Sequence, residues 1–134
     1  MFDRPEIPGR STSVRRGWAR KFAAAGRGLV RAVAGQSSFA VHLAVAAVVV
    51  ALAAALRVSA VEWCLLVGAI AVVLTAEIFN TAVESLARAL GPGRHPRIRD
   101  ALDMASAAVL VAACGSAVVG LIVFGSRLLT LVGS

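Results

Sequence analysis

Four polar side chains lie in a stretch that otherwise has the composition of a membrane span: Glu77, Asn80, Thr81 and Glu84. Their spacing of i, i+3, i+4 and i+7 places all four on one face of a helix. The preceding stretch, 64–76, has no charged residue. Because an ionisable group at membrane depth is costly, this polar stripe is the first candidate for a functional site.

The two carboxylates of the stripe suit metal-assisted phosphoryl transfer. Glu77 and Glu84 are two helical turns apart, about 10 Å along the axis. In such a transfer one carboxylate binds Mg²⁺ and another accepts a proton from the attacking hydroxyl. Near the membrane surface, a lipid alcohol could reach one carboxylate while a nucleotide reaches the other. The basic segment 94–99 adds cationic groups for the phosphates.

Spacing alone leaves two other interpretations open. The stripe could form hydrogen bonds across helices and so specify a helix bundle. It could also belong to a small proton-coupled transporter, since transporters use membrane carboxylates as well. The transporter interpretation is less attractive than the other two, because the chain has only three apolar tracts of spanning length and its polar residues form one cluster at a helix end.

The composition indicates what holds the stripe in place. The chain has 134 residues, a mean hydropathy of +0.84 and 59% hydrophobic residues, which is too apolar for an ordinary soluble domain. Three apolar tracts, at about 39–56, 63–90 and 105–124, are near the length that crosses a bilayer as a helix. We therefore expect an all-α membrane protein with three transmembrane helices. Because three helices of a single chain would shelter the polar stripe poorly, we also expect a homo-oligomer.

The segment before the first span has two parts. Residues 1–12 carry prolines and mixed charge and are expected to form a flexible tail. Residues from about 13 to 34 alternate basic and apolar groups, which predicts an amphipathic helix on the cytoplasmic membrane surface. A basic flank that only sets topology is an equally open interpretation. Residues 13–134 are then a single membrane domain.

The basic residues are distributed unevenly along the chain. Eight of the 14 Lys and Arg residues precede the first span, and four more lie at 88–99. The positive-inside rule then places the N-terminus and the second loop in the cytoplasm, and the C-terminus outside. The protein is expected in the cytoplasmic membrane. Because topology explains the net charge of +7, no nucleic-acid partner is expected.

Smaller signals predict where the helices end. The segment 57–62 is expected to be a short outer turn, and Gly91-Pro92-Gly93 to end the second span. Asp100 or Asp103 should begin the third helix, where a carboxylate suits the helix dipole. The two cysteines lie within spans and are interpreted as small packing residues rather than a disulfide or a metal pair.

Several blocks together resemble a known family. The block Glu-x-x-Asn-Thr-Ala-x-Glu at 77–84, His95-Pro96, and the segment 103–110 are similar to the signature of the prokaryotic diacylglycerol kinase and undecaprenol kinase family. The resemblance extends from about Gly28 to Ala113. It implies a homotrimer of three-span subunits, each with a surface helix, that transfers the γ-phosphate of MgATP to a lipid alcohol at sites shared between subunits. ATP and Mg²⁺ are the cofactors it implies.

The resemblance also implies residue roles. Glu77 would be the general base on the lipid hydroxyl, Asn80 would orient groups around the reacting oxygen, and Glu84 would bind Mg²⁺. The remaining implied contacts are those to the nucleotide from Arg94, His95 and Asp103, to the lipid from Ser106, and to metal and nucleotide from Gln36.

Three positions depart from the family pattern. Gln36 stands where the family usually has a second metal-binding Glu, Arg88 where it has Asp, and Leu102 where it has Lys. These changes predict weaker nucleotide handling, and a catalytically degenerate, non-enzymatic member of the same fold is the alternative. Either undecaprenol or diacylglycerol could be the lipid. His95-Pro96, Glu62-Trp63 and the Phe39/His42 pair are closer to the undecaprenol kinase branch.

Overall fold

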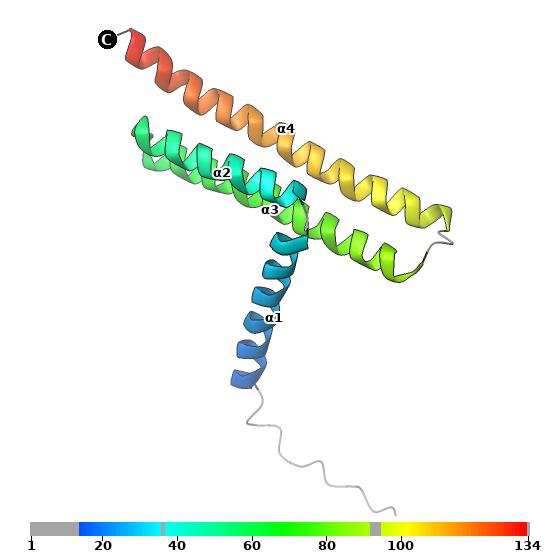
Figure 1. Cartoon of the computed structure of the whole chain (residues 1–134). Helices are drawn as coiled ribbons and strands as arrows, with labels where there is room; N and C mark the ends of the chain where they lie inside the picture. The colour runs from blue at the N-terminus through cyan, green and yellow to red at the C-terminus, as the bar shows by residue number, and fades with distance from the viewer. Residues whose placement is uncertain (1–13, 36, 92–94, 134) are drawn as a thin grey trace, which may run out of the picture.

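The computed structural model describes residues 14–35, 37–91 and 95–133. This part of the chain forms four helices: α1 (Val14–Gly35), α2 (Ser37–Ala55), α3 (Ala60–Ala89) and α4 (Pro96–Val132). Figure 1 shows α2, α3 and α4 running antiparallel side by side, with α1 leaving the bundle at a steep angle. The last three helices are long and apolar enough to cross a membrane. The predicted all-α membrane fold is therefore confirmed.

The bundle of a single chain has a small core at the end where α2 meets α3. It consists of Ala53, Val58, Leu66 and Val123, and α3 packs much more extensively along α4 than along α2. Large apolar side chains elsewhere on the spans, such as Val111 and Leu121, are exposed on the single chain. Such faces suit lipid tails or the helices of other copies, and not water.

The junction between α2 and α3 is shorter than the sequence predicts. Arg57 adopts a positive φ of 50°, and the N–H of Val58 donates to the carbonyl of Ala53 at 3.2 Å, as in a Schellman cap. The N–H of Ser59 then donates to Oε2 of Glu62 at 2.6 Å, and the N–H of Glu62 donates to Oγ of Ser59 at 3.3 Å. This capping box begins α3 at Ala60, so the expectation of a turn lasting to Glu62 and a span from 63 is wrong by about one helical turn.

The junction between α3 and α4 confirms one prediction and corrects another. Gly91 has a φ of 85°, and its N–H donates to the carbonyl of Arg88 at 3.2 Å, so a glycine does end α3. However, α4 begins at Pro96 and not at Asp100 or Asp103. Proline fits the first turn of a helix because it lacks the N–H that would have no partner there. The helix then continues to Val132, well beyond the predicted span of 105–124.

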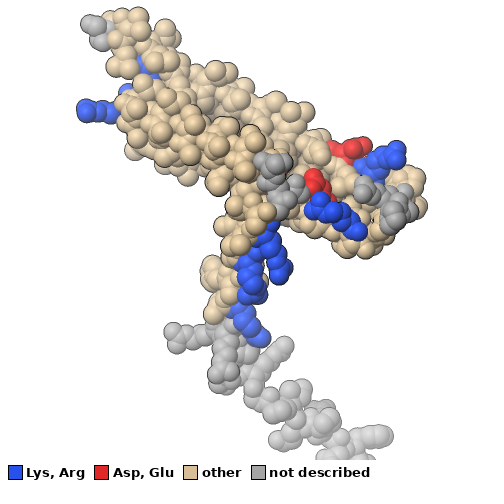
Figure 2. All heavy atoms as spheres, viewed as in Figure 1, with Lys and Arg blue, Asp and Glu red and all other residues tan. Residues whose placement is uncertain are grey.

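Helix α1 lies where the sequence predicts an amphipathic helix, and its side chains are compatible with one. Figure 2 shows basic side chains along it, whereas the three-helix part is mostly uncharged on the face in view. The rings of Trp18 and Phe22 lie 6.3 Å apart, and Nζ of Lys21 lies 4.9 Å from the centre of the Trp18 ring. A membrane-surface position for α1 stays a prediction, and the predicted tail lies outside the described residues.

The polar stripe lies along the part of α3 that extends past the start of α2. A hydrogen bond from Ser38, near the start of α2, reaches Glu77 on α3. From Glu77, α3 continues for about 12 more residues, or ~18 Å, beyond the level at which α2 begins. The stripe therefore starts at the level where α1 and α2 meet and follows the part of α3 that α2 leaves uncovered.

Candidate functional site

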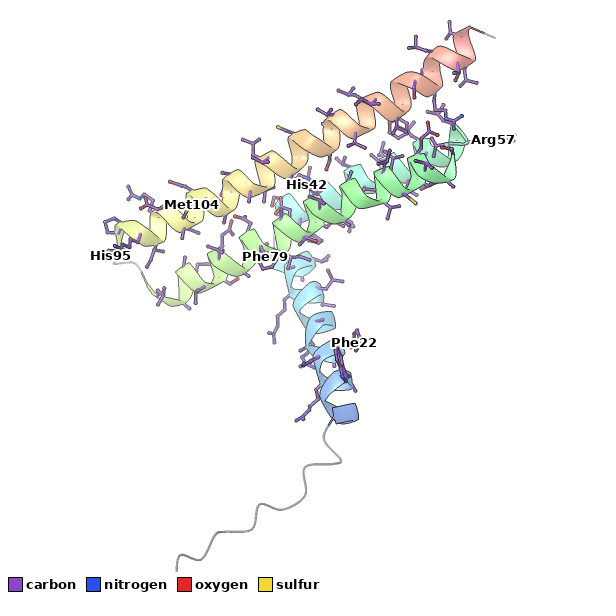
Figure 3. The ribbon with its side chains drawn as sticks, turned by 180° about the vertical axis from the view of Figure 1, so that it is seen from behind. Phe22, His42, Arg57, Phe79, His95 and Met104 are labelled. Atoms are coloured by element: carbon purple, nitrogen blue, oxygen red, sulfur yellow. The ribbon has the colours of Figure 1, made fainter. Side chains whose placement is uncertain are left out.

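Glu77 is buried between α3 and the beginning of α2. Its residue exposure is 2%, the lowest of any charged residue in the described part of the chain. Nε2 of His42 lies 2.9 Å from its Oε1, and Oγ of Ser38 donates to its Oε2 at 3.2 Å. Ser38 and His42 are four residues apart and so share one face of α2. The carboxylate is therefore held by α2 through both of its oxygens. Figure 3 labels His42 on α2.

The stripe continues toward the loop end of α3 as a chain of polar contacts. Nδ2 of Asn80 donates to Oε1 of Glu84 at 3.0 Å, and Asn80 is only 9% exposed. One turn further, Nη1 of Arg88 lies 3.8 Å from Oε2 of Glu84. The structure thus joins Asn80 to Glu84, and Glu77 to α2, along a single face of α3.

Two buried polar atoms on this face lack a partner in the described part of the chain. They are Oδ1 of Asn80 and Oγ1 of Thr81. Buried polar atoms in folded proteins nearly always form a hydrogen bond. Asn80 also lines a cavity of about 830 Å³ between α3 and α4. Phe79 and Met104, both labelled in Figure 3, line it as well. A polar group that enters this cavity would meet Asn80 and Thr75 among mostly apolar side chains.

The residues predicted to contact nucleotide and lipid lie apart from Glu77. Asp103 and Ser106 are exposed on α4, and Oγ of Ser106 donates to the carbonyl of Leu102 at 3.0 Å. Within the described ranges, neither forms a hydrogen bond or ion pair with α3. His95 caps α4, and its Nδ1 accepts from the N–H of Arg97 at 3.4 Å. The two other predicted residues, Gln36 and Arg94, lie outside the described residues.

The contacts of Ser38 and His42 with Glu77 were not predicted from the sequence. His42 had a signal, since it is the only polar residue in the first apolar tract. Ser38 stands at the start of α2, where serine is common for local reasons of helix capping. Its position therefore did not indicate a contact with another helix.

The oxygen atoms around Glu84 suit magnesium better than a transition metal. No group of three His, Cys, Asp or Glu that could hold a metal together occurs among residues 14–35, 37–91 and 95–133. Mg²⁺ does not need one, because it binds through one or two carboxylates, phosphate oxygens and water. Glu84 and Oδ1 of Asn80 offer oxygens of this kind, so the donor set fits Mg²⁺ bound together with a phosphate.

The chain combines three helices that could cross a membrane with a carboxylate held between α3 and α2 and a second carboxylate two turns away. Residues 23–124 match the family model described as prokaryotic diacylglycerol kinase. This match covers most of the chain, so the chain belongs to that family of lipid kinases. It is also similar to the undecaprenol kinase of Bacillus subtilis (strain 168), with 30% identity over 109 residues that span 81% of this chain and 89% of the relative.

Proposed function

We propose that the protein transfers the γ-phosphate of ATP to a lipid alcohol at the cytoplasmic face of the cytoplasmic membrane, with Mg²⁺ as cofactor. The observation that carries this proposal is the buried Glu77 carboxylate, held by α2 on the same helix face as the Asn80–Glu84 pair. Undecaprenol is the acceptor we favour over diacylglycerol. Its support is the similarity to a relative named undecaprenol kinase.

In this mechanism Glu77 is the general base. The lipid hydroxyl donates its proton to a Glu77 oxygen while the hydroxyl oxygen bonds to the γ-phosphorus. The bond from that phosphorus to the bridging oxygen breaks, and ADP leaves. An ionised carboxylate has about four lone-pair sites, and the contacts from α2 occupy two. Each oxygen therefore keeps one site for the hydroxyl of the lipid.

The other stripe residues prepare the phosphate side. Glu84, with Gln36, would hold the metal, and Asn80 would orient groups around the reacting oxygen through its Oδ1. Mg²⁺, when bound, supplies positive charge against the transferring phosphoryl group. Arg94, His95 and Asp103 would contact the nucleotide, and Ser106 the lipid.

We further propose that the active assembly is a homotrimer whose N-terminus faces the cytoplasm. Support for assembly comes from the exposed apolar side chains along the spans and from the partnerless Oδ1 of Asn80. Asp103 and Ser106 would then serve the Glu77 of another subunit, which would account for their separation from Glu77 within one chain. The distribution of arginines supports the orientation.

A second candidate is a degenerate member of the family without kinase activity. It is favoured by the position of Arg88, whose guanidinium lies beside the carboxylate proposed to bind metal. An adjacent cation opposes the binding of another cation to Glu84. Leu102, where the family has Lys, also removes a charge that would stabilise the transferring phosphate.

A phosphate-transfer assay in mixed micelles tests the proposal, with purified protein, labelled MgATP and either undecaprenol or diacylglycerol. We expect labelled lipid from undecaprenol. Product from diacylglycerol alone would support the proposed kinase activity but would show that diacylglycerol, and not undecaprenol, is the acceptor. No product from either lipid, together with no rise in Tm on addition of MgATP, would favour the degenerate member. If MgATP raises Tm but no lipid is labelled, Gln36→Glu with Leu102→Lys should restore transfer if the chain is a kinase that lacks these charges.

A further inference from the structure

We infer that His42 is a positioning residue for the proposed base, acting through its contact with Glu77. The inference rests on the proposed function and deepens it. Nε2 of His42 lies 2.9 Å from Oε1 of Glu77, the shorter of the two contacts that α2 makes with this carboxylate. An ionised carboxylate can only accept hydrogen bonds, so Nε2 carries the hydrogen and donates it to Glu77.

The surroundings of His42 make this contact decisive for the orientation of the carboxylate. Among the described residues, the side-chain partners of Glu77 are His42 and Ser38, and both come from α2. They contact different oxygens, which fixes the rotation of the carboxylate about its terminal bond. The contact from Ser38 is 3.2 Å long, near the upper limit for an O–H···O hydrogen bond. Without His42, this weaker bond alone would hold the carboxylate.

His42 also connects the base with an apolar cavity of about 670 Å³ between α2, α3 and α4. It lines this cavity, and its side chain is 25% exposed while that of Glu77 is 3% exposed. The imidazole therefore lies between the buried carboxylate and the space beside it. A base that swings away from its substrate loses rate steeply, because an error of about 1 Å can cost on the order of 100-fold in turnover.

A role in positioning differs from a role in tying α2 to α3. A simple tie would affect Tm and assembly and would leave turnover per folded trimer unchanged. A positioning residue changes kcat more than either KM, and its effect disappears once the group it positions is removed.

The test compares three variants in the mixed-micelle assay with undecaprenol. His42→Leu removes the donor. His42→Gln keeps an N–H donor at a similar reach. Val45→Leu is the matched control, since Val45 lines the same cavity one turn further along α2 and is exposed. We expect His42→Leu to lower kcat by about 10- to 100-fold with both KM values within about twofold. His42→Gln should recover most of the loss, and Val45→Leu should match the wild type.

A double variant separates the two roles. In a Glu77→Gln background, His42→Leu should cause no further loss of turnover, because the positioned base is already absent. A further loss similar to that in the wild-type background would overturn the inference. So would full turnover in His42→Leu, or equal losses in His42→Leu and His42→Gln.

Two additional results keep the outcomes distinct. If His42→Leu does not assemble, His42→Asn replaces it, since its shorter amide does not reach Glu77; we expect the same loss of kcat, and full turnover would overturn the inference. If the wild type transfers no phosphate to any lipid, the proposed function fails and the inference with it. A wild type that is active while His42→Leu is equally active rejects the inference alone.

Discussion

Helix α3 carries two held carboxylates with contrasting partners, Glu62 near its start and Glu77 in its second half. Nε of Arg127 donates to both oxygens of Glu62, at 2.9 and 3.2 Å, and its Nη2 donates to Oε2 as well. The N–H of Ser59 adds another donor. Glu77 instead has an imidazole and a hydroxyl as its partners.

The different partners of the two carboxylates indicate which of them can accept a proton from a substrate. The oxygens of Glu62 accept several donors, one of them a guanidinium that stays charged at any relevant pH. Such a group joins α3 to α4 and has little capacity to accept a proton from a substrate. Glu77 is more buried, yet it keeps lone pairs, and its side-chain partners in the described part of the chain, His42 and Ser38, include no permanent cation. We therefore propose a structural role for Glu62 and a chemical role for Glu77.

Among substitutions at residues other than Glu77, the largest effect is expected from Glu84→Gln. This change preserves the shape and a hydrogen-bond acceptor for Asn80 but removes the charge proposed to bind Mg²⁺. We expect kcat/KM for MgATP to fall on the order of 100-fold. A magnesium titration of the transfer rate should show a higher half-saturating concentration. An unchanged titration curve would remove Glu84 from the metal site.

Arg127→Leu should act on stability and leave the chemistry intact. It removes the cation that joins the start of α3 to α4. We expect a clear fall in Tm, measured by tryptophan fluorescence or scanning calorimetry in detergent, with turnover per folded protein unchanged. Arg88→Leu is the matched control, because its contact with Glu84 lies within one helix and is largely exposed. A large loss of turnover in Arg127→Leu, measured under conditions where the variant is fully folded, would contradict the structural role of Glu62 and its contrast with Glu77.

Arg88→Ala should produce a smaller effect of the opposite sign on metal use. The Arg88 side chain is 60% exposed and lies 3.8 Å from Glu84, so the ion pair is weak. Its removal should lower the half-saturating magnesium concentration by about two- to fivefold. The same titration measures this, and a higher magnesium requirement would refute competition between Arg88 and the metal.

The smallest effect is expected from Arg57→Gly in the turn between α2 and α3. Arg57 has a φ of 50°, a conformation that costs an L-residue about 1 kcal/mol or more and costs glycine much less. Glycine also gains more freedom in the unfolded chain, so the net stabilisation should be about 0.5 kcal/mol. A small rise in Tm with unchanged turnover is the expected outcome. A lower Tm would mean that contacts of the Arg57 side chain outweigh the backbone strain.

The sequence predicted the features that depend on local pattern. Hydropathy identified three spans, the spacing of the polar stripe placed it on one face of α3, and Gly91 marked the end of that helix. The Asn80–Glu84 contact follows from the same i, i+4 spacing. The start of α4 could also have been read from Pro96, because proline favours the first turn. The preference of a carboxylate for the helix dipole is weaker than this preference of proline, and α4 begins at Pro96.

The contacts between helices could not be predicted in the same way. Periodicity says which residues share a face, but not how far one helix is shifted along its neighbour. The meeting of His42 with Glu77, and of Glu62 with Arg127, depends on that shift and on the short capped turn at Ser59. The proposed roles of Asp103 and Ser106 rest on the resemblance to the family alone. A single chain does not bring them to Glu77.

The most direct test of the division along α3 compares Glu77→Gln with Glu62→Gln in one assay. Both changes keep size and remove charge, and transfer of labelled phosphate from MgATP to undecaprenol is measured per folded protein. The account predicts that Glu77→Gln loses turnover by about 10²- to 10⁴-fold with Tm close to that of the wild type. Glu62→Gln should instead lose Tm and keep turnover. Substantial turnover in Glu77→Gln, or equal losses of turnover in both variants, would contradict the account.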